Sequence, residues 1–133
     1  MKIALIGYGK MGREIEQIAL QRGHEIALIV DLNNFSTFNS EQLKNVDVAI
    51  EFTIPEAAIK NYQICFEAQV PVVSGTTGWL AKWDEVVAQC QAHHTAFFYA
   101  SNYSLGVNLF FELNKTLARL MAPFDQYKAE MIE

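Results

Sequence analysis

The chain has little positive charge and no long apolar run. Ten Lys and Arg residues stand against fifteen Asp and Glu residues, which gives a formal net charge of −5. This charge disfavours nucleic acid as a partner, because phosphate backbones are bound by basic surfaces. An anionic cofactor is still compatible with it, since backbone N–H groups bind phosphate on acidic proteins as well. No apolar stretch approaches the roughly 20 residues of a membrane span, so we expect no membrane partner.

Cysteine and histidine are also scarce. The two cysteines, Cys65 and Cys90, are far apart and lack metal-ligand spacing, which disfavours a disulfide framework or a zinc site. No Ser/His/Asp or Cys/His arrangement appears in a suitable place, so we assign no catalytic residue and no metal ligand. His93 and His94 lie between a predicted helix and a predicted strand, where a solvated helix-terminal pair is expected. Only four apolar residues precede Gly7, too few for a signal peptide, so we expect a cytoplasmic protein.

What the sequence does contain is an alternation of strand and helix signals. Apolar strands are predicted at residues 2–6, 25–31, 47–53, 71–74 and 95–100. Helical spacing of apolar residues separates them, for example at Met11, Ile15, Ile18 and Ala19. A final helix after Ser104 carries a long apolar stripe that should pack on the sheet. Continuous apolar strands between amphipathic helices predict an α/β fold with a doubly wound parallel sheet, Rossmann-like, over residues 1–126.

The first strand leads directly into a Gly-x-Gly-x-x-Gly turn. Gly7 permits the tight turn, Gly9 lets the backbone approach a pyrophosphate, and Gly12 lets the following helix pack closely. The start of that helix offers unpaired N–H groups to phosphates. The whole turn, with Tyr8, Lys10 and Met11, is therefore a candidate dinucleotide site.

Asp31 ends the second strand, 22 residues after Gly9. A carboxylate at this place accepts hydrogen bonds from both hydroxyls of an adenosine ribose. It also repels a 2′-phosphate, and the next residues include no arginine that would receive one. The sequence thus favours NADH, while Lys10 and Arg13 partly offset the repulsion and leave NADPH possible.

Two further loops follow strands at the same edge of the sheet. In the loop 75–78, Gly75, Thr76 and Thr77 could meet a nicotinamide carboxamide or a substrate carboxylate; the alternative is a capped turn in which Thr77 starts the next helix. Asn102 and Tyr103 follow the fifth strand. The Asn102 amide could pair with a carboxamide and Tyr103 could lie against a ring; the alternative is that both are ordinary loop residues.

Together, four segments resemble the N-terminal part of the dihydrodipicolinate reductase family. They are Gly9-Lys10-Met11-Gly12-Arg13, Glu51-Phe52-Thr53 with Pro55, Gly75-Thr76-Thr77-Gly78, and Ser101-Asn102-Tyr103-Ser104-Leu105-Gly106-Val107-Asn108. The last segment is the most specific, and the resemblance covers essentially the whole chain.

This resemblance implies roles for the matching residues. Gly7–Gly12 would cradle the pyrophosphate, and Asp31 would hold the adenosine ribose. The cofactor would touch Phe52 and Thr53 as it crosses the sheet edge. The nicotinamide would lie between Gly75–Thr77 and the segment Ala100, Ser101, Asn102 and Tyr103. The family reduces a cyclic dicarboxylate, 4-hydroxy-tetrahydrodipicolinate, with hydride from NADH or NADPH in diaminopimelate and lysine biosynthesis. From the resemblance we expect the full-length enzyme to be a homo-oligomer.

The chain departs from the family pattern in two places. Its first turn is one residue tighter, with Lys10 in place of an arginine, which keeps the charge but loses the bidentate fork. The family's His-His pair, lysine and Ser-Gly-Thr loop, expected after residue 133, do not occur. We therefore expect residues 127–133 to be the first strand of an absent α+β catalytic domain. As an unpaired edge strand, residues 127–133 should fray or pair with another chain. The fragment should bind cofactor without turnover.

Two alternatives stay open at this stage. One is another NAD-dependent oxidoreductase on the same fold, and the other is a regulatory domain that senses a dinucleotide.

Overall fold

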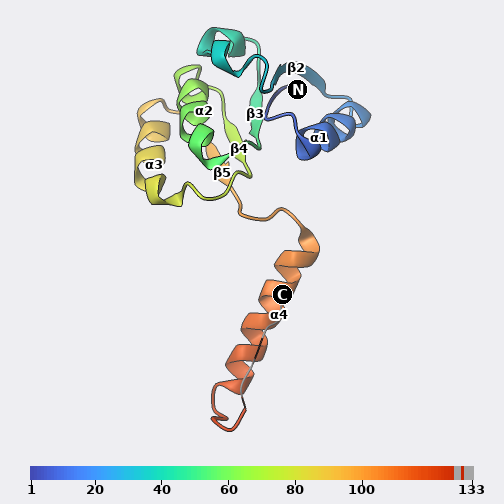
Figure 1. Cartoon of the computed structure of the whole chain (residues 1–133), viewed down its shortest axis with the longest axis vertical. Coiled ribbons are helices and arrows are strands. Elements are labelled where there is room, and N and C mark those ends of the chain that lie inside the picture. Colours follow the sequence, from blue (N-terminus) through green and yellow to red (C-terminus); the bar gives the residue numbers. More distant parts are fainter. Residues whose placement is uncertain (128–129, 131–133) are drawn as a thin grey trace. The chain divides into compact units, whose positions relative to one another are not determined.

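The computed structural model describes residues 1–127 and residue 130. The chain divides into two compact units, Met1–Ser101 and Asn102–Glu133. The first unit alternates strands and helices along the chain, as the sequence predicts (Figure 1). The predicted domain boundary between residues 126 and 127 stays a prediction.

Five parallel strands form a single sheet in the first unit. They are β1 (Lys2–Ile6), β2 (Glu25–Val30), β3 (Val48–Glu51), β4 (Val72–Ser74) and β5 (Phe97–Tyr99). Their order across the sheet is β2-β1-β3-β4-β5, and every neighbouring pair is parallel. All five strands lie within the predicted ranges, so the doubly wound parallel sheet is confirmed.

Three α-helices connect these strands. They are α1 (Lys10–Gln21), α2 (Pro55–Glu67) and α3 (Trp83–Ala92). Pro55 takes the first turn of α2, where its missing N–H costs nothing. Gly23, with φ of +75°, follows the end of α1, a position that favours glycine. Short 3₁₀ helices occur at Phe35–Thr37, Ser40–Leu43 and Leu80–Lys82.

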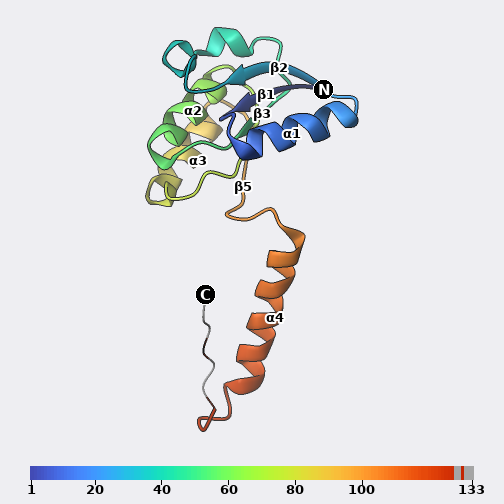
Figure 2. The same ribbon diagram turned by 45° about the vertical axis from the view of Figure 1, so that its right-hand side comes forward.

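Two apolar clusters cover the two faces of the sheet, because successive strand side chains point to opposite sides. Ala4 and Ile6 belong to the larger cluster, which also contains buried residues of α2 and α3. Ile3 and Leu5 belong to the smaller one, together with Ala19 of α1. Figure 2 shows α1 on one side of the sheet and α2 with α3 on the other.

The buried face of α1 does not coincide with its apolar residues. Gly12 and Ala19 are buried, but Met11 is 50% and Ile18 46% exposed, so the apolar spacing of α1 does not by itself mark its buried face. The contact line of the helix runs through Gly12, Ile15 and Ala19. A neighbour in sequence is turned by about 100° around the axis, which carries Met11 and Ile18 away from the sheet.

The chain order of the strands reverses direction at the centre of the sheet. The connection from β1 leads outward to β2, and β3 then returns to the other side of β1. Ligands of open α/β sheets bind beyond the carboxyl ends of the strands at such a switch point. The loops that follow β1 and β3 therefore flank the expected binding position.

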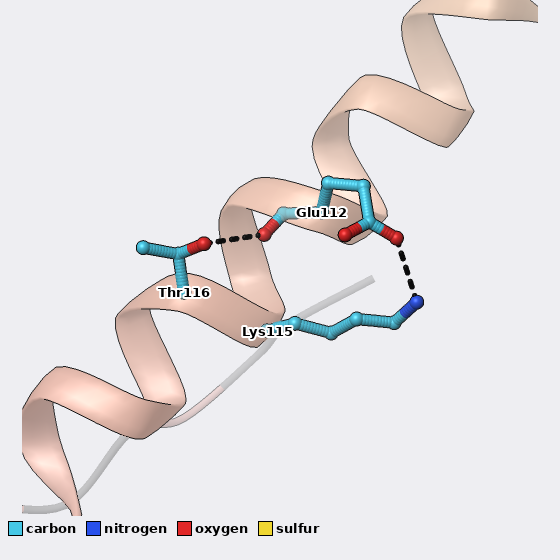
Figure 3. A network of polar contacts seen from close by, with 3 residues as sticks. All are labelled: Glu112, Lys115 and Thr116. Carbon is cyan, nitrogen blue, oxygen red and sulfur yellow. Dashed lines mark hydrogen bonds and ion pairs between the residues drawn. The ribbon is translucent and has the colours of Figure 1, made fainter.

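The second unit contains the helix α4 (Leu105–Met121). Ser104 caps this helix, since its Oγ accepts a hydrogen bond from the Val107 N–H at 3.4 Å. On its surface, the Glu112 carboxylate accepts a hydrogen bond from Lys115 Nζ at 2.7 Å, and the Glu112 carbonyl accepts one from Thr116 Oγ1 at 3.0 Å (Figure 3). Exposed pairs of this kind add a few tenths of a kcal/mol to a helix.

Within the second unit the apolar stripe of α4 is uncovered, and its predicted packing on the sheet stays a prediction. None of the residues of α4 is buried, and Leu105 and Leu113 are 75% and 65% exposed. The second unit contains no other described helix or strand to cover this stripe.

The predicted strand at residues 127–133 lies outside the described residues, apart from Tyr127 and Glu130, which have no regular structure. In the described part of the chain, none of the helices has both the length and the apolarity that crossing a membrane requires.

Candidate functional site

The turn between β1 and α1 needs two of its three glycines for its own geometry. Gly7 has φ of +95°, and its N–H donates to the Val30 carbonyl at 2.9 Å. A Cβ added to Gly12 would lie 2.3 Å from the Gly7 carbonyl oxygen, so no side chain fits there. A Cβ on Gly9 would meet no atom within 4 Å. Gly7 and Gly12 are therefore required by the fold, whereas Gly9 faces open space.

The N-terminus of α1 borders that space. Gly9 is the N-cap and supplies no side-chain hydrogen bond, and the first turn contains no acidic residue. The Arg13 N–H donates to the Gly9 carbonyl at 3.2 Å, which leaves the preceding amides of the turn without intrahelical acceptors. These amides and the Lys10 charge make this end of the helix suited to a diphosphate.

Phe52 lies between the turns that follow β1 and β4. A Cβ on Gly7 would lie 2.0 Å from the Phe52 carbonyl oxygen, and a Cβ on Gly75 would lie 2.1 Å from Cε1 of the Phe52 ring. The Phe52 N–H also donates to the Ile6 carbonyl at 2.8 Å. The structure therefore gives Gly75 a packing role that the sequence did not indicate.

Asp31 lies at the carboxyl end of β2, and its carboxylate is held by a neighbour. It accepts hydrogen bonds from the Asn33 N–H at 2.8 Å and from Asn33 Nδ2 at 3.1 Å. Asn34 accepts a bond from the Asp31 N–H at 2.8 Å and donates to the Ile29 carbonyl at 2.8 Å. The sequence analysis notes only that the residues after Asp31 include no arginine, and it gives these asparagines no role of their own. Asn residues just after a strand are, however, typical of such turns.

Two hollows at this edge of the sheet share Gly9, Phe52 and Thr53. The first has a volume of about 500 Å³ and is lined by Gly7, Tyr8, Gly9, Val30, Asp31, Leu32, Asn33, Phe35, Phe52, Thr53, Ile54 and Ala57. The second has a volume of about 320 Å³ and is lined by Gly9, Lys10, Met11, Gly12, Phe52, Thr53, Gly75, Thr76 and Thr77. The structure thus brings together the predicted residues of the first unit up to Thr77.

The wall of the first hollow contains apolar residues that sequence reasoning missed. They are Leu32, Phe35, Ile54 and Ala57. Leu32 is 97% exposed and Ile54 58% exposed, which is unusual for residues of this type. Their position directly after β2 and β3 is the signal that would have found them, because these two strands flank β1.

Tyr8 lines the first hollow but directs its hydroxyl to α1. Its hydroxyl donates a hydrogen bond to the Glu16 carboxylate, and the Arg13 guanidinium lies 5.6 Å from the centre of its ring. The hydrogen bond to Glu16, followed by burial, raises the pKa of Tyr8. The side chain therefore fastens the glycine turn to its helix.

The loop 75–78 does not form the capped turn that the sequence left open. The 3₁₀ helix after it begins at Leu80, and its N-cap is Trp79 without a side-chain hydrogen bond. Thr76 instead turns inward, where its Oγ1 accepts a bond from the Thr53 N–H at 2.7 Å. Thr77 is exposed and lines the second hollow.

The segment after β5 is divided between the two units. Ala100 and Ser101 end the first unit, and the Ala100 N–H donates to the Ser74 carbonyl at 3.3 Å. Asn102 and Tyr103 belong to the second unit, where the Asn102 side chain accepts a bond from the Ser104 N–H at 2.8 Å. Asn108, which sequence reasoning gave no role, donates to the Asn102 carbonyl at 3.1 Å. The contacts of this segment with a cofactor stay predictions.

His93 and His94 follow α3, where the sequence expects them. His93 is the C-cap, and His94 is exposed with φ of +52°. Cys65 and Cys90 are buried free thiols, and burial raises the pKa of both. Within residues 1–127 and 130, no three His, Cys, Asp or Glu side chains are grouped as metal ligands.

A family model described as "Dihydrodipicolinate reductase, N-terminus" matches residues 1–103. The chain belongs to the dihydrodipicolinate reductase family. The matched residues contain both hollows and every predicted site residue, which confirms the resemblance first drawn from the four sequence segments.

Several curated relatives share the name 4-hydroxy-tetrahydrodipicolinate reductase. The 4-hydroxy-tetrahydrodipicolinate reductase of Christiangramia forsetii is 46% identical over 135 residues, which cover 100% of this chain and 55% of the relative. The protein of the same name from Acinetobacter baylyi is 31% identical over 153 residues, or 99% of this chain and 55% of the relative. The chain thus spans about half the length of the curated relatives that it matches.

Solved structures agree on the fold. The dipicolinate-bound dihydrodipicolinate reductase from Paenisporosarcina sp. TG-14 matches 89% of this chain and 54% of its own, with a TM-score of 0.68 and 20% identity. A putative homoserine dehydrogenase from Archaeoglobus fulgidus matches 74% of this chain and 42% of its own, with a TM-score of 0.60 and 14% identity. At these identities the likeness concerns the fold alone. Membership of the dihydrodipicolinate reductase family disfavours the two alternatives left open by the sequence.

Proposed function

We propose that this chain is the cofactor-binding part of a 4-hydroxy-tetrahydrodipicolinate reductase and binds a reduced nicotinamide dinucleotide. The observation that carries the proposal is the position of Asp31 and the open N-terminus of α1 at one edge of the sheet. Asp31 and Gly9, the N-cap of α1, line the same hollow of about 500 Å³. A ribose acceptor beside a diphosphate site is the arrangement that a dinucleotide requires.

Each part of such a ligand has a candidate contact among the described residues. The amides that start α1 would bind the diphosphate, and Asp31 would accept bonds from the ribose hydroxyls. The apolar side chains of Leu32, Phe35 and Ile54 offer a surface for the adenine ring. Because β3 and β4 lie on the other side of β1 from β2, the nicotinamide half would extend toward Thr53 and the loop 75–77. The segment 100–103 belongs to this proposal as well.

NADH is the cofactor that we propose as preferred. The Asp31 carboxylate, held in place by Asn33, would repel a 2′-phosphate at the same ribose. Lys10 and Arg13 lie on the first turn of α1 and would partly compensate this repulsion. NADPH binding with lower affinity is therefore expected.

The reaction of the longer protein is part of the proposal. The bound cofactor would supply a hydride to a cyclic dicarboxylate, a substrate class supported by the dipicolinate bound to the Paenisporosarcina enzyme. The chain spans about half of its curated relatives, so we propose that residues absent from this sequence bind the substrate and supply the proton. Turnover by the 133-residue chain alone is not expected. Assembly of the longer protein as a homo-oligomer and a cytoplasmic location belong to the same proposal.

A fluorescence titration of the 133-residue chain with NADH tests the central statement. Saturable binding is expected for the wild type, and Gly9→Val should abolish it, because the new side chain would fill the open space at the start of α1. Ala88→Val, at an exposed position of α3, is the matched control and should bind NADH as the wild type does. Absence of saturable binding to the folded wild type would overturn the proposal.

A further inference from the structure

Glu51 is a buried carboxylate without an ion pair. It ends β3, and its exposed fraction is 0%. Among the described residues, no Lys, Arg or His side chain lies within ion-pair distance of it. A buried carboxylate is costly unless hydrogen bonds replace its water shell, so the groups around Glu51 must supply those bonds.

Three hydroxyl groups take this role. Ser74 Oγ donates to Glu51 Oε2 at 2.8 Å, and Thr76 Oγ1 donates to Oε1 at 3.0 Å. Thr53 Oγ1 also donates to Oε1. The three donors come from the end of β4 and from the loops that follow β3 and β4. The carboxylate therefore joins two loops that are 23 residues apart in sequence.

Each of these hydroxyls also accepts a bond from a further donor. The Thr53 N–H donates to Thr76 Oγ1 at 2.7 Å, and Asn61 Nδ2 donates to Thr53 Oγ1 at 3.3 Å. The hydroxyls of Tyr62 and Ser74 are 2.6 Å apart, and because Ser74 gives its proton to Glu51, Tyr62 is the donor. The hydrogen bonds named above thus run toward Glu51, although Thr53 Oγ1 also has a longer contact with the Ile54 carbonyl at 3.4 Å.

This direction of the hydrogen bonds requires that the side chain of residue 51 accepts hydrogen bonds and donates none. Glutamine has the same shape as glutamate, but its amide donates two hydrogens and its single oxygen replaces two acceptors. In Glu51→Gln, at least one of the three hydroxyls would have to turn its hydrogen away from residue 51, and the hydrogen bonds behind it would have to rearrange. The bond from the Thr53 N–H to Thr76 is one of those at risk, and it connects the two loops directly.

We propose that Glu51 is a positioning residue that holds Thr53 and Thr76 in register, so that the loops after β3 and β4 form a preorganised nicotinamide site. This inference rests on the proposed function. Glu51 does not line either hollow and touches no cofactor; it acts through the two threonines, which do line the hollows. The adenosine side of the site, formed by Asp31, Asn33 and Phe35, shares no hydrogen bond with this group.

Two ligands distinguish positioning from a general loss of structure. ADP occupies only the adenosine and diphosphate parts, whereas NADH also needs the nicotinamide side. Glu51→Gln is expected to raise the Kd of NADH at least about tenfold and to leave the Kd of ADP within about twofold. The enhancement of NADH fluorescence at saturation should also fall, because it reports the surroundings of the nicotinamide ring.

Glu67→Gln is the matched control, since Glu67 is an exposed residue of α2. It should bind both ligands as the wild type does. If Glu51→Gln does not fold, Ser74→Ala, which removes one of the three donors, replaces it with the same expected difference between NADH and ADP. Equal loss of ADP and NADH binding, or no loss of either in folded protein, would overturn the inference. Failure of the wild type to bind either ligand would overturn the proposed function instead.

Discussion

The ring of Phe52 occupies the place where Gly75 lacks a side chain. A Cβ on Gly75 would lie 2.1 Å from Cε1 and 2.4 Å from Cζ of that ring. Phe52 follows β3 and Gly75 follows β4, so this contact fixes the separation of two loops at the proposed site. A glycine that the sequence marks as part of a binding loop is thus also required for packing.

Gly75→Ala should weaken both stability and NADH binding. The methyl group would displace the Phe52 ring, and overpacking of this kind costs about 1–3 kcal/mol. Urea denaturation would measure the loss in the free energy of unfolding, and NADH titration the loss in affinity. Gly106→Ala is the control, because a Cβ there meets only Ser104 Oγ at 3.8 Å, and it should leave stability unchanged or slightly raised. Unchanged stability of Gly75→Ala would contradict the contact.

Asp31→Asn should reduce NADH affinity about 10–100-fold, the range expected when hydrogen bonds to a charged acceptor are weakened. NADPH affinity should fall less or rise, since the charge that repels its 2′-phosphate is gone. Parallel titrations with the two cofactors measure the ratio. Asp84→Asn on the exposed first turn of α3 serves as the control. A ratio that does not move toward NADPH would contradict the role given to Asp31.

Gly12→Ala and Gly9→Ala should have opposite consequences. A Cβ on Gly12 would lie 2.3 Å from a backbone oxygen, which cannot move aside as a side chain can, so the free energy of unfolding should fall by about 2 kcal/mol or more. A Cβ on Gly9 meets nothing within 4 Å, so Gly9→Ala should keep its stability and lose NADH affinity. Denaturation and titration of both variants test this pair, and a stable Gly12→Ala variant would be the contrary result.

Tyr62→Phe should make the chain less sensitive to alkaline pH. Burial, and after it the Glu51 carboxylate, raises the pKa of Tyr62 above its ordinary value of 10.0. Above about pH 10 the unfolded chain therefore releases a proton that the folded chain keeps, so stability falls as pH rises. Below about pH 9 Tyr62 keeps its proton in both the folded and the unfolded chain, so this loss of stability does not occur.

Melting temperatures between about pH 8 and pH 11 measure the effect. Tyr62→Phe should be less stable than the wild type by about 1–3 kcal/mol at neutral pH, because the Ser74 hydroxyl loses its donor. Its alkaline fall should nevertheless be shallower. Cys65, whose pKa burial also raises, contributes equally to both proteins and cancels in the comparison. Parallel pH profiles of the two proteins would show that Tyr62 ionises freely in the fold.

Much of this architecture could be predicted from the sequence because local patterns determine it. Apolar runs such as Ile3–Ile6 leave no polar face, so they require a sheet covered on both sides. The geometric roles of Gly7 and Gly12 are predictable because a positive φ and a close backbone contact are demands that only glycine meets. The Ser104 cap and the Pro55 helix start are equally local signals.

Other features could not be predicted, because they depend on which segments meet in space. The exposure of Met11 and Ile18 follows from the small residues on which α1 happens to rest, and helical spacing alone does not give that rotation. The apolar wall at Leu32 and Ile54 depends on the strand order. The apolar stripe of α4 likewise predicts a buried face, but the helical spacing does not say which segment would cover it.

The sequence by itself determined the glycine turn, the acidic residue at the end of the second strand and the family. Each of these is carried by residues close together in the chain or by a motif of fixed spacing. The tertiary structure alone decided that Phe52 fills the space beside Gly75 and that Glu51 gathers hydroxyls from two loops. These contacts exist because the parallel sheet places the ends of β3 and β4 next to each other, although 23 residues separate Glu51 from Ser74.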